Sequence, residues 1–268
     1  MTERLAGGKL LLDSPAEAVV RIVISNPERR NALDHEILDA LAETLPRLDR
    51  GIETRCVLIT GAGAAFSAGY DIASIPSETF ERDAEALVAH PFHAAMEAIA
   101  RHPWPTVAAI NGHCLGGGLE LAITCDLRIC AEGAKLGMPP AKLGLVYGHT
   151  GLRKFLDTVG LARTKELFLT GRNFEARRAE QIGLVHEVVE AERFEDAAVE
   201  LAAEIAANAP ISMRGNKRAI EVLNENPILS EQQEAGLIAL RESCFASEDL
   251  REGIAAFAEK RKPRWRGR

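Results

Sequence analysis

The chain has 268 residues, enough to bury a large core in one or two domains. Hydrophobic residues make up 47% and charged residues 26%, which is ordinary for a soluble globular protein. The formal net charge of −7 argues against nucleic acid as a main partner, although Lys and Arg gather after residue 259. No run reaches the roughly 18 apolar residues of a membrane span, and residues 1–9 lack the apolar core of a secretion signal. We therefore expect a cytoplasmic protein that binds neither nucleic acid nor a membrane.

Strands and helices alternate in the predicted order over residues 1–190. β-Branched apolar runs bounded by turn residues predict strands at 17–25, 55–60, 106–110, 126–131 and 186–189. Apolar residues at helical spacing predict helices at 34–48 (with Asp34 as N-cap), 80–100, 119–125, 151–159, 163–169 and 175–181. Residues 136–147 are rich in Gly and Pro and are expected to form a loop.

Only helices are predicted after residue 190, at 193–208, 211–224, 230–245 and from about 249 to 261. Alternating elements followed by helices alone favour an α/β core with a helical appendage. We expect the core to span residues 1–190 and the C-terminal helical region to span residues 191–268.

The segment 105–126 carries the clearest functional signal. A buried strand at 106–110 leads through Gly116-Gly117-Gly118 into an apolar helical run. Glycines at a helix start let a ligand approach backbone N–H groups, and the helix dipole favours an oxyanion there. Glu120 is the one carboxylate in the first turn, so we expect it to be poorly solvated and suited to acid/base chemistry. The cysteines, five in number with no Cys-x-x-Cys pair, are typical of reduced buried thiols, and no metal-ligand cluster is visible.

A series of motifs in fixed order covers nearly the whole chain. They are Asn26-Pro27 with Asn31-Ala32-Leu33, residues 65–72, residues 109–112 leading to Glu120 and Cys125-Asp126, Leu169-Thr170-Gly171, Gly183-Leu184-Val185, and residues 252–262. With these motifs the chain resembles the crotonase superfamily, the enoyl-CoA hydratase/isomerase enzymes. The resemblance implies a spiral of ββα turns, a helical trimerisation region at the C-terminus, and homotrimers that pair into hexamers.

The chemistry that the resemblance implies is stabilisation of a CoA thioester enolate by two backbone N–H groups, here those of Tyr70 and Gly117. One such donor is typically worth a few kcal/mol of barrier. The substrate would be an acyl-CoA, with no cofactor besides the CoA that the substrate carries and no metal. Residues that the resemblance or their charge places along the CoA path are Arg30, Ala32, Ala68, Asp71, Ile72, Ala73, Phe257 and Lys260, the last two often across a subunit boundary.

The chain departs from the well-known hydratases of this family at their second glutamate. That position falls at Pro140, and proline cannot transfer a proton. Tyr147 stands where hydratases usually have a small residue, which makes the sequence look like the methylmalonyl-CoA decarboxylase branch. There, Tyr147 would orient the substrate carboxylate or donate a proton, and Glu120 would desolvate or repel the carboxylate.

Three functions stay open on the sequence. Decarboxylation of a short malonyl-type CoA thioester is the leading one, and enoyl-CoA hydration or double-bond isomerisation is the alternative. A CoA-binding scaffold without activity is the rival of another class, and the retained Glu120 argues against it.

Overall fold

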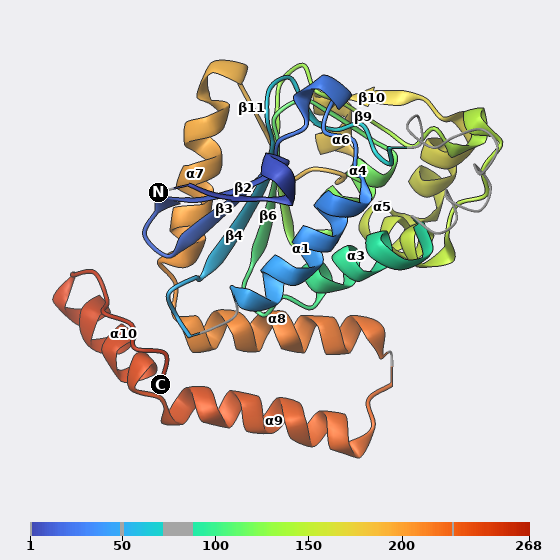
Figure 1. Cartoon of the computed structure of the whole chain (residues 1–268). Coiled ribbons are helices and arrows are strands. Elements are labelled where there is room, and N and C mark those ends of the chain that lie inside the picture. Colours follow the sequence, from blue (N-terminus) through green and yellow to red (C-terminus); the bar gives the residue numbers. More distant parts are fainter. Residues whose placement is uncertain (1, 49–50, 72–87, 227) are drawn as a thin grey trace.

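The computed structural model describes residues 2–48, 51–71, 88–226 and 228–268 (Figure 1). Its strands form two sheets. The larger sheet has the order β1(Glu3–Leu5), β2(Leu10–Ala16), β3(Val19–Ile24), β4(Cys56–Gly61), β6(Thr106–Ile110), β8(Leu127–Ala131), β11(Glu187–Val189). The smaller sheet has the order β10(Asn173–Glu175), β9(Lys135–Gly137), β7(His113–Leu115), β5(Ala65–Ser67). Within the larger sheet β1, β2 and β3 pair antiparallel, and β3 through β11 pair parallel.

Successive chain segments repeat one pattern, in which a strand of the larger sheet is followed by a strand of the smaller sheet and then a helix. The three repeats are β4, β5 and α3(His93–Ala100); β6, β7 and α4(Gly117–Thr124); and β8, β9 and α5(His149–Thr170). Neighbouring repeats pair in parallel in both sheets. This arrangement is the predicted spiral of ββα turns.

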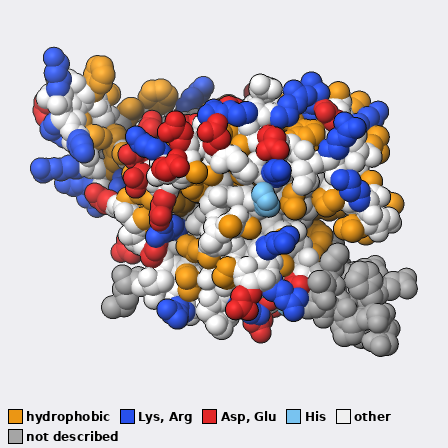
Figure 2. All heavy atoms as spheres, turned by 90° about the horizontal axis from the view of Figure 1, so that it is seen from above, with side chains coloured by type: hydrophobic (Ala, Val, Ile, Leu, Met, Phe, Trp, Pro, Cys, Tyr) orange, Lys and Arg blue, Asp and Glu red, His pale blue; other side chains and the backbone are white. Residues whose placement is uncertain are grey.

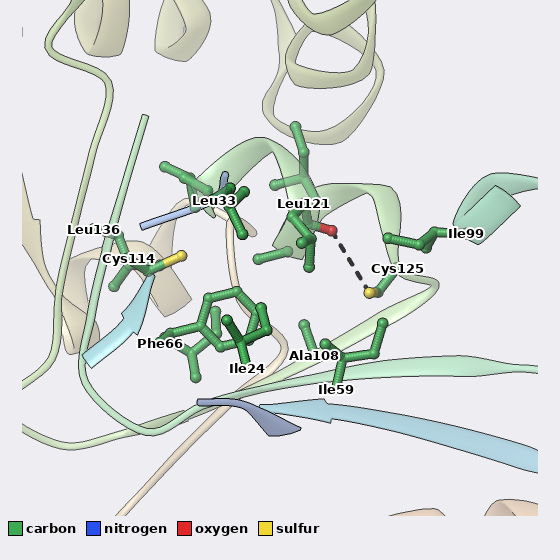
Figure 3. Close-up of a cluster of buried hydrophobic side chains, with 14 of the residues drawn as sticks. Ile24, Leu33, Ile59, Phe66, Ile99, Ala108, Cys114, Leu121, Cys125 and Leu136 are labelled. Atoms are coloured by element: carbon green, nitrogen blue, oxygen red, sulfur yellow. Dashed lines mark hydrogen bonds between the residues drawn. The ribbon is translucent and has the colours of Figure 1, made fainter. Parts of the chain in front are cut away.

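Successive side chains along a strand point to opposite faces of the larger sheet, so each face carries its own layer of helices. In β4, Val57 and Ile59 belong to the main core beneath α1(His35–Arg47) and α3, whereas Cys56 and Leu58 face α7(Phe194–Ala206). Figure 1 shows α7 on one side of the sheet and α1 with α3 on the other. Side chains from both sheets and from α4 meet in the main core, as Figure 3 shows.

The predicted helix at 34–48 is confirmed, and so is its cap. Asp34 accepts a hydrogen bond from Ile37 N at 3.0 Å, and Ile37, Leu38, Leu41 and Leu45 are all buried. The predicted strands and the C-terminal helices are likewise present, the latter as α7, α8(Pro210–Glu225), α9(Glu231–Ala246) and α10(Glu248–Glu259).

One prediction of local structure is wrong. The segment predicted as a loop, residues 136–147, contains most of strand β9 and a 3-10 turn, η5(Pro140–Leu143). The strand was not predicted because it is too short to show a pattern of its own, and it is defined by its pairing with β7 and β10. The helices predicted at 151–159 and 163–169 are confirmed as the two parts of α5, which non-helical backbone at Gly160 (φ 73°) separates. The third is confirmed as α6(Ala176–Gln181). Of the helix predicted at 80–100, the described part is a π-helical turn at Val88–Phe92 followed by α3.

The division at residue 190 stays a prediction. Helix α7 packs on the larger sheet, and Figure 1 shows α8 directly beneath the body, with α9 and α10 farther from it. In the part of the chain that the structure describes, no helix combines the length and apolar character needed to cross a membrane.

Candidate active site

A cavity of about 1100 Å³ lies between the spiral and the C-terminal helices. Its walls come from α3, α4, the start of α5, and α8. Helix α8 is held over it by Lys217, whose Nζ donates to Asp126 Oδ2 at 2.7 Å and to Trp104 O at 3.1 Å. The cavity therefore has a fixed wall on the side of the C-terminal helices.

Glu120 lies at the inner end of this cavity, on the first turn of α4. Nearly all residues of this helix are buried, and Glu120 itself is only 5% exposed. Helix α5 approaches it closely, because a Cβ added at Gly151 would lie 2.7 Å from Glu120 Oε2. The carboxylate is thus held in place by the packing of α4 against α5, and its burial agrees with its predicted place in the first turn of an apolar helix.

Two tyrosines extend from Glu120 in a chain of hydroxyl groups. Tyr147 donates a hydrogen bond to Glu120 Oε2 at 2.5 Å, and the Tyr147 and Tyr70 hydroxyl oxygens are 3.4 Å apart. The Tyr70 ring packs edge-on against Phe92 at 4.7 Å between centroids. All four side chains line the cavity.

Burial is the main influence on the pKa values of Glu120, Tyr147 and Tyr70. It raises the pKa of Glu120 above its usual value, while the hydrogen bond from Tyr147 and the charge of Lys154 act in the opposite direction. Burial, and then the negative charge of Glu120, raises the pKa of both tyrosines above 10. Both phenols are therefore neutral around pH 7 and able to hold or donate a proton.

The backbone places the amides of Tyr70 and Gly117 at the same end of the cavity. Leu33 N donates to Gly69 O at 2.7 Å and Asp71 N donates to Leu33 O at 3.0 Å, so the Tyr70 N–H between them points away from that strand-like segment. A Cβ added at Gly69 (φ 96°) would lie 3.1 Å from Gly117 N, which shows how closely the two segments approach. Gly117 is the first residue of α4, where an N–H has no acceptor within the helix. Among the described residues, neither N–H makes a hydrogen bond.

Comparison with known proteins agrees with this arrangement. The sequence model for enoyl-CoA hydratase/isomerase matches residues 15–268. The chain belongs to the enoyl-CoA hydratase/isomerase family. A probable enoyl-CoA hydratase of Bacillus subtilis is 39% identical, over 93% of this chain and 95% of the relative.

Solved structures of the enoyl-CoA hydratase/isomerase family confirm the predicted fold. An enoyl-CoA hydratase from Bacillus anthracis superimposes with a TM-score of 0.88 at 34% identity, covering 97% of this chain and 100% of that one. A putative family member from Hyphomonas neptunium gives a TM-score of 0.88 at 37% identity, covering 97% and 98%. The chain is therefore a crotonase-fold enzyme of this family.

The residues predicted to contact CoA divide into three groups. Arg30, Ala32, Ala68 and Asp71 lie beside the Tyr70 amide, since Ala68 N donates to Arg30 O at 2.9 Å and Asp71 pairs with Leu33. Ile72 and Ala73 lie outside the described residues. Phe257 and Lys260 lie on α10 and at its end, away from the residues that line the cavity, and Phe257 is 88% exposed. Their role as CoA ligands stays a prediction.

The structure also brings in side chains that the sequence did not single out. Lys154 of α5 lines the cavity near Glu120, and Gly151 provides the close approach of α5. Tyr70 was predicted for its amide alone, yet its ring and hydroxyl line the cavity as well. Within the described residues, no group of three or more His, Cys, Asp or Glu side chains is placed to hold a metal ion.

Replacing Tyr147 with phenylalanine is expected to raise the pKa of Glu120 further. The Tyr147 hydroxyl stabilises the ionised carboxylate, so its loss favours the protonated form. The pKa is measured by ¹³C NMR of carboxyl-labelled glutamate, with the Glu120 signal assigned by its absence in Glu120→Gln. Tyr70→Phe is the matched control, because its hydroxyl contacts Tyr147 rather than Glu120. An unchanged Glu120 titration in Tyr147→Phe would contradict this account of the site.

Proposed function

We propose that this enoyl-CoA hydratase/isomerase family member decarboxylates a short malonyl-type CoA thioester such as methylmalonyl-CoA. The observation that supports it most is the composition of the inner site. The carboxylate in contact with the phenols is Glu120, and Pro140, at the position of the second glutamate of hydratases, is buried and starts a 3-10 turn. A site with two neutral phenols and one carboxylate is better suited to protonating a carbanion than to activating water.

The reaction begins when the bond between C2 and the substrate carboxylate breaks and CO₂ leaves. The electron pair moves into the thioester carbonyl, and the N–H groups of Tyr70 and Gly117 stabilise the enolate oxygen. Glu120, held in an apolar helix, disfavours a second carboxylate beside it and so favours loss of CO₂. The Tyr147 hydroxyl gives its proton to C2, and the tyrosinate regains a proton from solvent through Glu120. No cofactor is needed beyond the CoA of the substrate.

The test is incubation of the purified protein with methylmalonyl-CoA and, separately, with crotonyl-CoA, followed by chromatography of the thioesters. Propionyl-CoA from the first and no 3-hydroxybutyryl-CoA from the second is the expected result. Propionyl-CoA formed in D₂O should carry one deuterium at C2. The Glu120→Gln variant serves as the control for non-enzymatic decarboxylation.

Hydration or isomerisation of an enoyl-CoA is the second candidate, and the names of the relatives favour it. The Bacillus subtilis relative is called a probable enoyl-CoA hydratase, and a relative 31% identical from Clostridium acetobutylicum is called a short-chain-enoyl-CoA hydratase. In that reaction Glu120 would activate water or move a proton between carbons without a second glutamate. Formation of 3-hydroxybutyryl-CoA from crotonyl-CoA, with methylmalonyl-CoA left intact, would establish this candidate and reject decarboxylation.

We also propose that the chain works as a homotrimer, or as a pair of trimers, in the cytoplasm. Large apolar side chains on the surface support an assembly, because they would otherwise remain in water. Those exposed by half or more on η5, the following loop, α5, α9 and α10 are Leu143, Leu145, Val146, Leu161, Leu169, Phe245, Ile254 and Phe257. In such a trimer Phe257 and Lys260 would reach the CoA bound to a neighbouring copy. The projecting C-terminal part, at the left of Figure 2, carries several of the basic side chains that would meet its phosphates.

A further inference from the structure

Lys154 places a positive charge in the cavity beyond the catalytic carboxylate. It lies on α5, one turn after Gly151, and its side chain lines the cavity together with Glu120 and Met96. Its Nζ donates a hydrogen bond to Thr124 Oγ1 at 2.8 Å. The Thr124 hydroxyl in turn donates to Glu120 O at 2.7 Å, so it acts toward the lysine as an acceptor. The ammonium is thus anchored to α4 through one of its three N–H donors.

The position of Thr124 on α4 indicates how far along the helix the hydroxyl partner of Lys154 lies from Glu120. Thr124 follows Glu120 by four residues, which is about 6 Å along an α-helix. An acyl group with C2 beside Glu120 would need several more carbons to reach the level of Thr124, the residue to which the ammonium is bonded. The cavity offers that room, since its volume of about 1100 Å³ extends from Tyr70 to α8.

Three other cations that line the cavity have carboxylate partners, and a fourth, Arg214, lies over the Trp104 ring at 5.0 Å. Arg101 pairs with Glu97 at 2.9 Å and Arg218 with Glu221 at 3.8 Å, and Lys217 holds Asp126. The hydrogen bond of Lys154 is instead to a hydroxyl. Burial lowers the pKa of Lys154, and the charge of Glu120 opposes this effect. A half-buried ammonium bonded to a hydroxyl gains more from an anionic ligand than one that is already paired with a carboxylate.

We propose that the acyl group of the substrate ends in a carboxylate and that Lys154 binds it, which makes the ligand a dicarboxylyl-CoA thioester. This inference rests on the proposed function only in taking the Glu120 cavity as the acyl-CoA site. It concerns the far end of the acyl group. In decarboxylation the substrate would carry this carboxylate in addition to the one lost from C2, with methylmalonyl-CoA as a shortened analogue, and in hydration the substrate would be an enoyl-CoA with a terminal carboxylate. Lys154 is then a residue that determines specificity, with Thr124 as the residue that positions it.

The test compares the binding of two saturated thioesters by isothermal titration calorimetry. Glutaryl-CoA ends in a carboxylate and pentanoyl-CoA, of the same length, ends in a methyl group. Neither carries a carboxylate on C2 or a double bond, so neither is a substrate for decarboxylation or hydration, and binding alone is measured. We expect glutaryl-CoA to bind about tenfold or more tightly than pentanoyl-CoA, the usual effect of one hydrogen-bonded charge pair.

Lys154→Met is expected to abolish the preference for glutaryl-CoA while leaving the binding of pentanoyl-CoA unchanged. If the methionine variant folds poorly, Lys154→Gln should give the same result. Arg101→Met is the matched control, since it removes a cavity cation that is already paired, and it should retain the preference. Equal binding of the two thioesters by the unaltered protein would overturn the proposal without any variant, and so would a preference that survives in a folded Lys154 variant. Failure to decarboxylate methylmalonyl-CoA leaves the inference standing, whereas failure of both thioesters to bind would reject the acyl-CoA site itself.

Discussion

Glu120→Gln is expected to lower turnover of the thioester by about 10³-fold, within the range typical for loss of a positioned acid/base group. Glutamine has nearly the same shape and can still accept the hydrogen bond from Tyr147, so the packing of α4 on α5 should survive. What is lost is the negative charge and the ability to pass a proton. The measurement is kcat on the substrate that the product analysis identifies, with protein folding checked by circular dichroism.

A stability measurement separates this chemical effect from damage to the fold. The pKa of Glu120 is raised in the folded protein, so ionising it opposes folding at every pH above the unfolded value of 4.5. Glu120→Gln removes that cost and should therefore raise the free energy of unfolding near pH 8, with the gain fading as the pH falls from the raised pKa of Glu120 toward 4.5 and absent below 4.5. Glu97→Gln is the matched control, because Glu97 is exposed and pairs with Arg101 at the edge of the cavity. If neither the unaltered protein nor Glu120→Gln turns over any thioester while CoA still binds, a scaffold without activity is favoured instead.

The fold was predictable from the sequence where a single strand or helix buries enough apolar residues for its hydrophobic pattern to be visible. Strands β4 and β6 consist almost wholly of buried side chains, and α1 buries one complete face, so each is visible in the sequence. Strand β2 is different, because its Leu10 and Leu12 are buried but Asp13, Ser14 and Pro15 follow and give it the composition of a turn. The three-residue strands of the smaller sheet are too short to show a period at all. They exist because the spiral brings them together.

The residues of the candidate site likewise fall into those that a local motif predicts and those that only the fold brings together. Glu120 and Gly117 lie in one continuous motif, so local reasoning suffices for them. The contact between Tyr70 and Tyr147 joins residues 77 positions apart and needs the fold to be seen. Lys154 follows Gly151 by three residues on α5, which was a usable signal that the two share a face. Nothing in the sequence indicates, however, that this face meets Glu120 rather than solvent.

Gly117→Pro is the change with the second-largest expected effect, because it removes one of the two N–H groups assigned to the enolate oxygen. Proline is tolerated at the first residue of a helix, and Gly117 holds that position in α4. An added Cβ at Gly117 would nevertheless lie 2.8 Å from Tyr70 Cε1, so the comparison is made in a Tyr70→Ala background, where the ring is absent and the amide remains. We expect kcat/KM to fall 10²- to 10³-fold, which is the usual effect of losing one such donor.

The control in that background is Gly117→Ala, which adds the same Cβ but keeps the N–H. Any loss shared by the alanine and proline variants reports crowding at the start of α4, and only the difference between them reports the hydrogen bond. Thermal unfolding of both variants establishes that α4 and the core beneath it are intact, since Leu119 and Leu121 of that helix are fully buried. If the two variants fold equally well and turn the thioester over at the same rate, the Gly117 amide does not stabilise the transition state. The enolate charge would then have to be stabilised by the Tyr70 amide and the phenol chain alone.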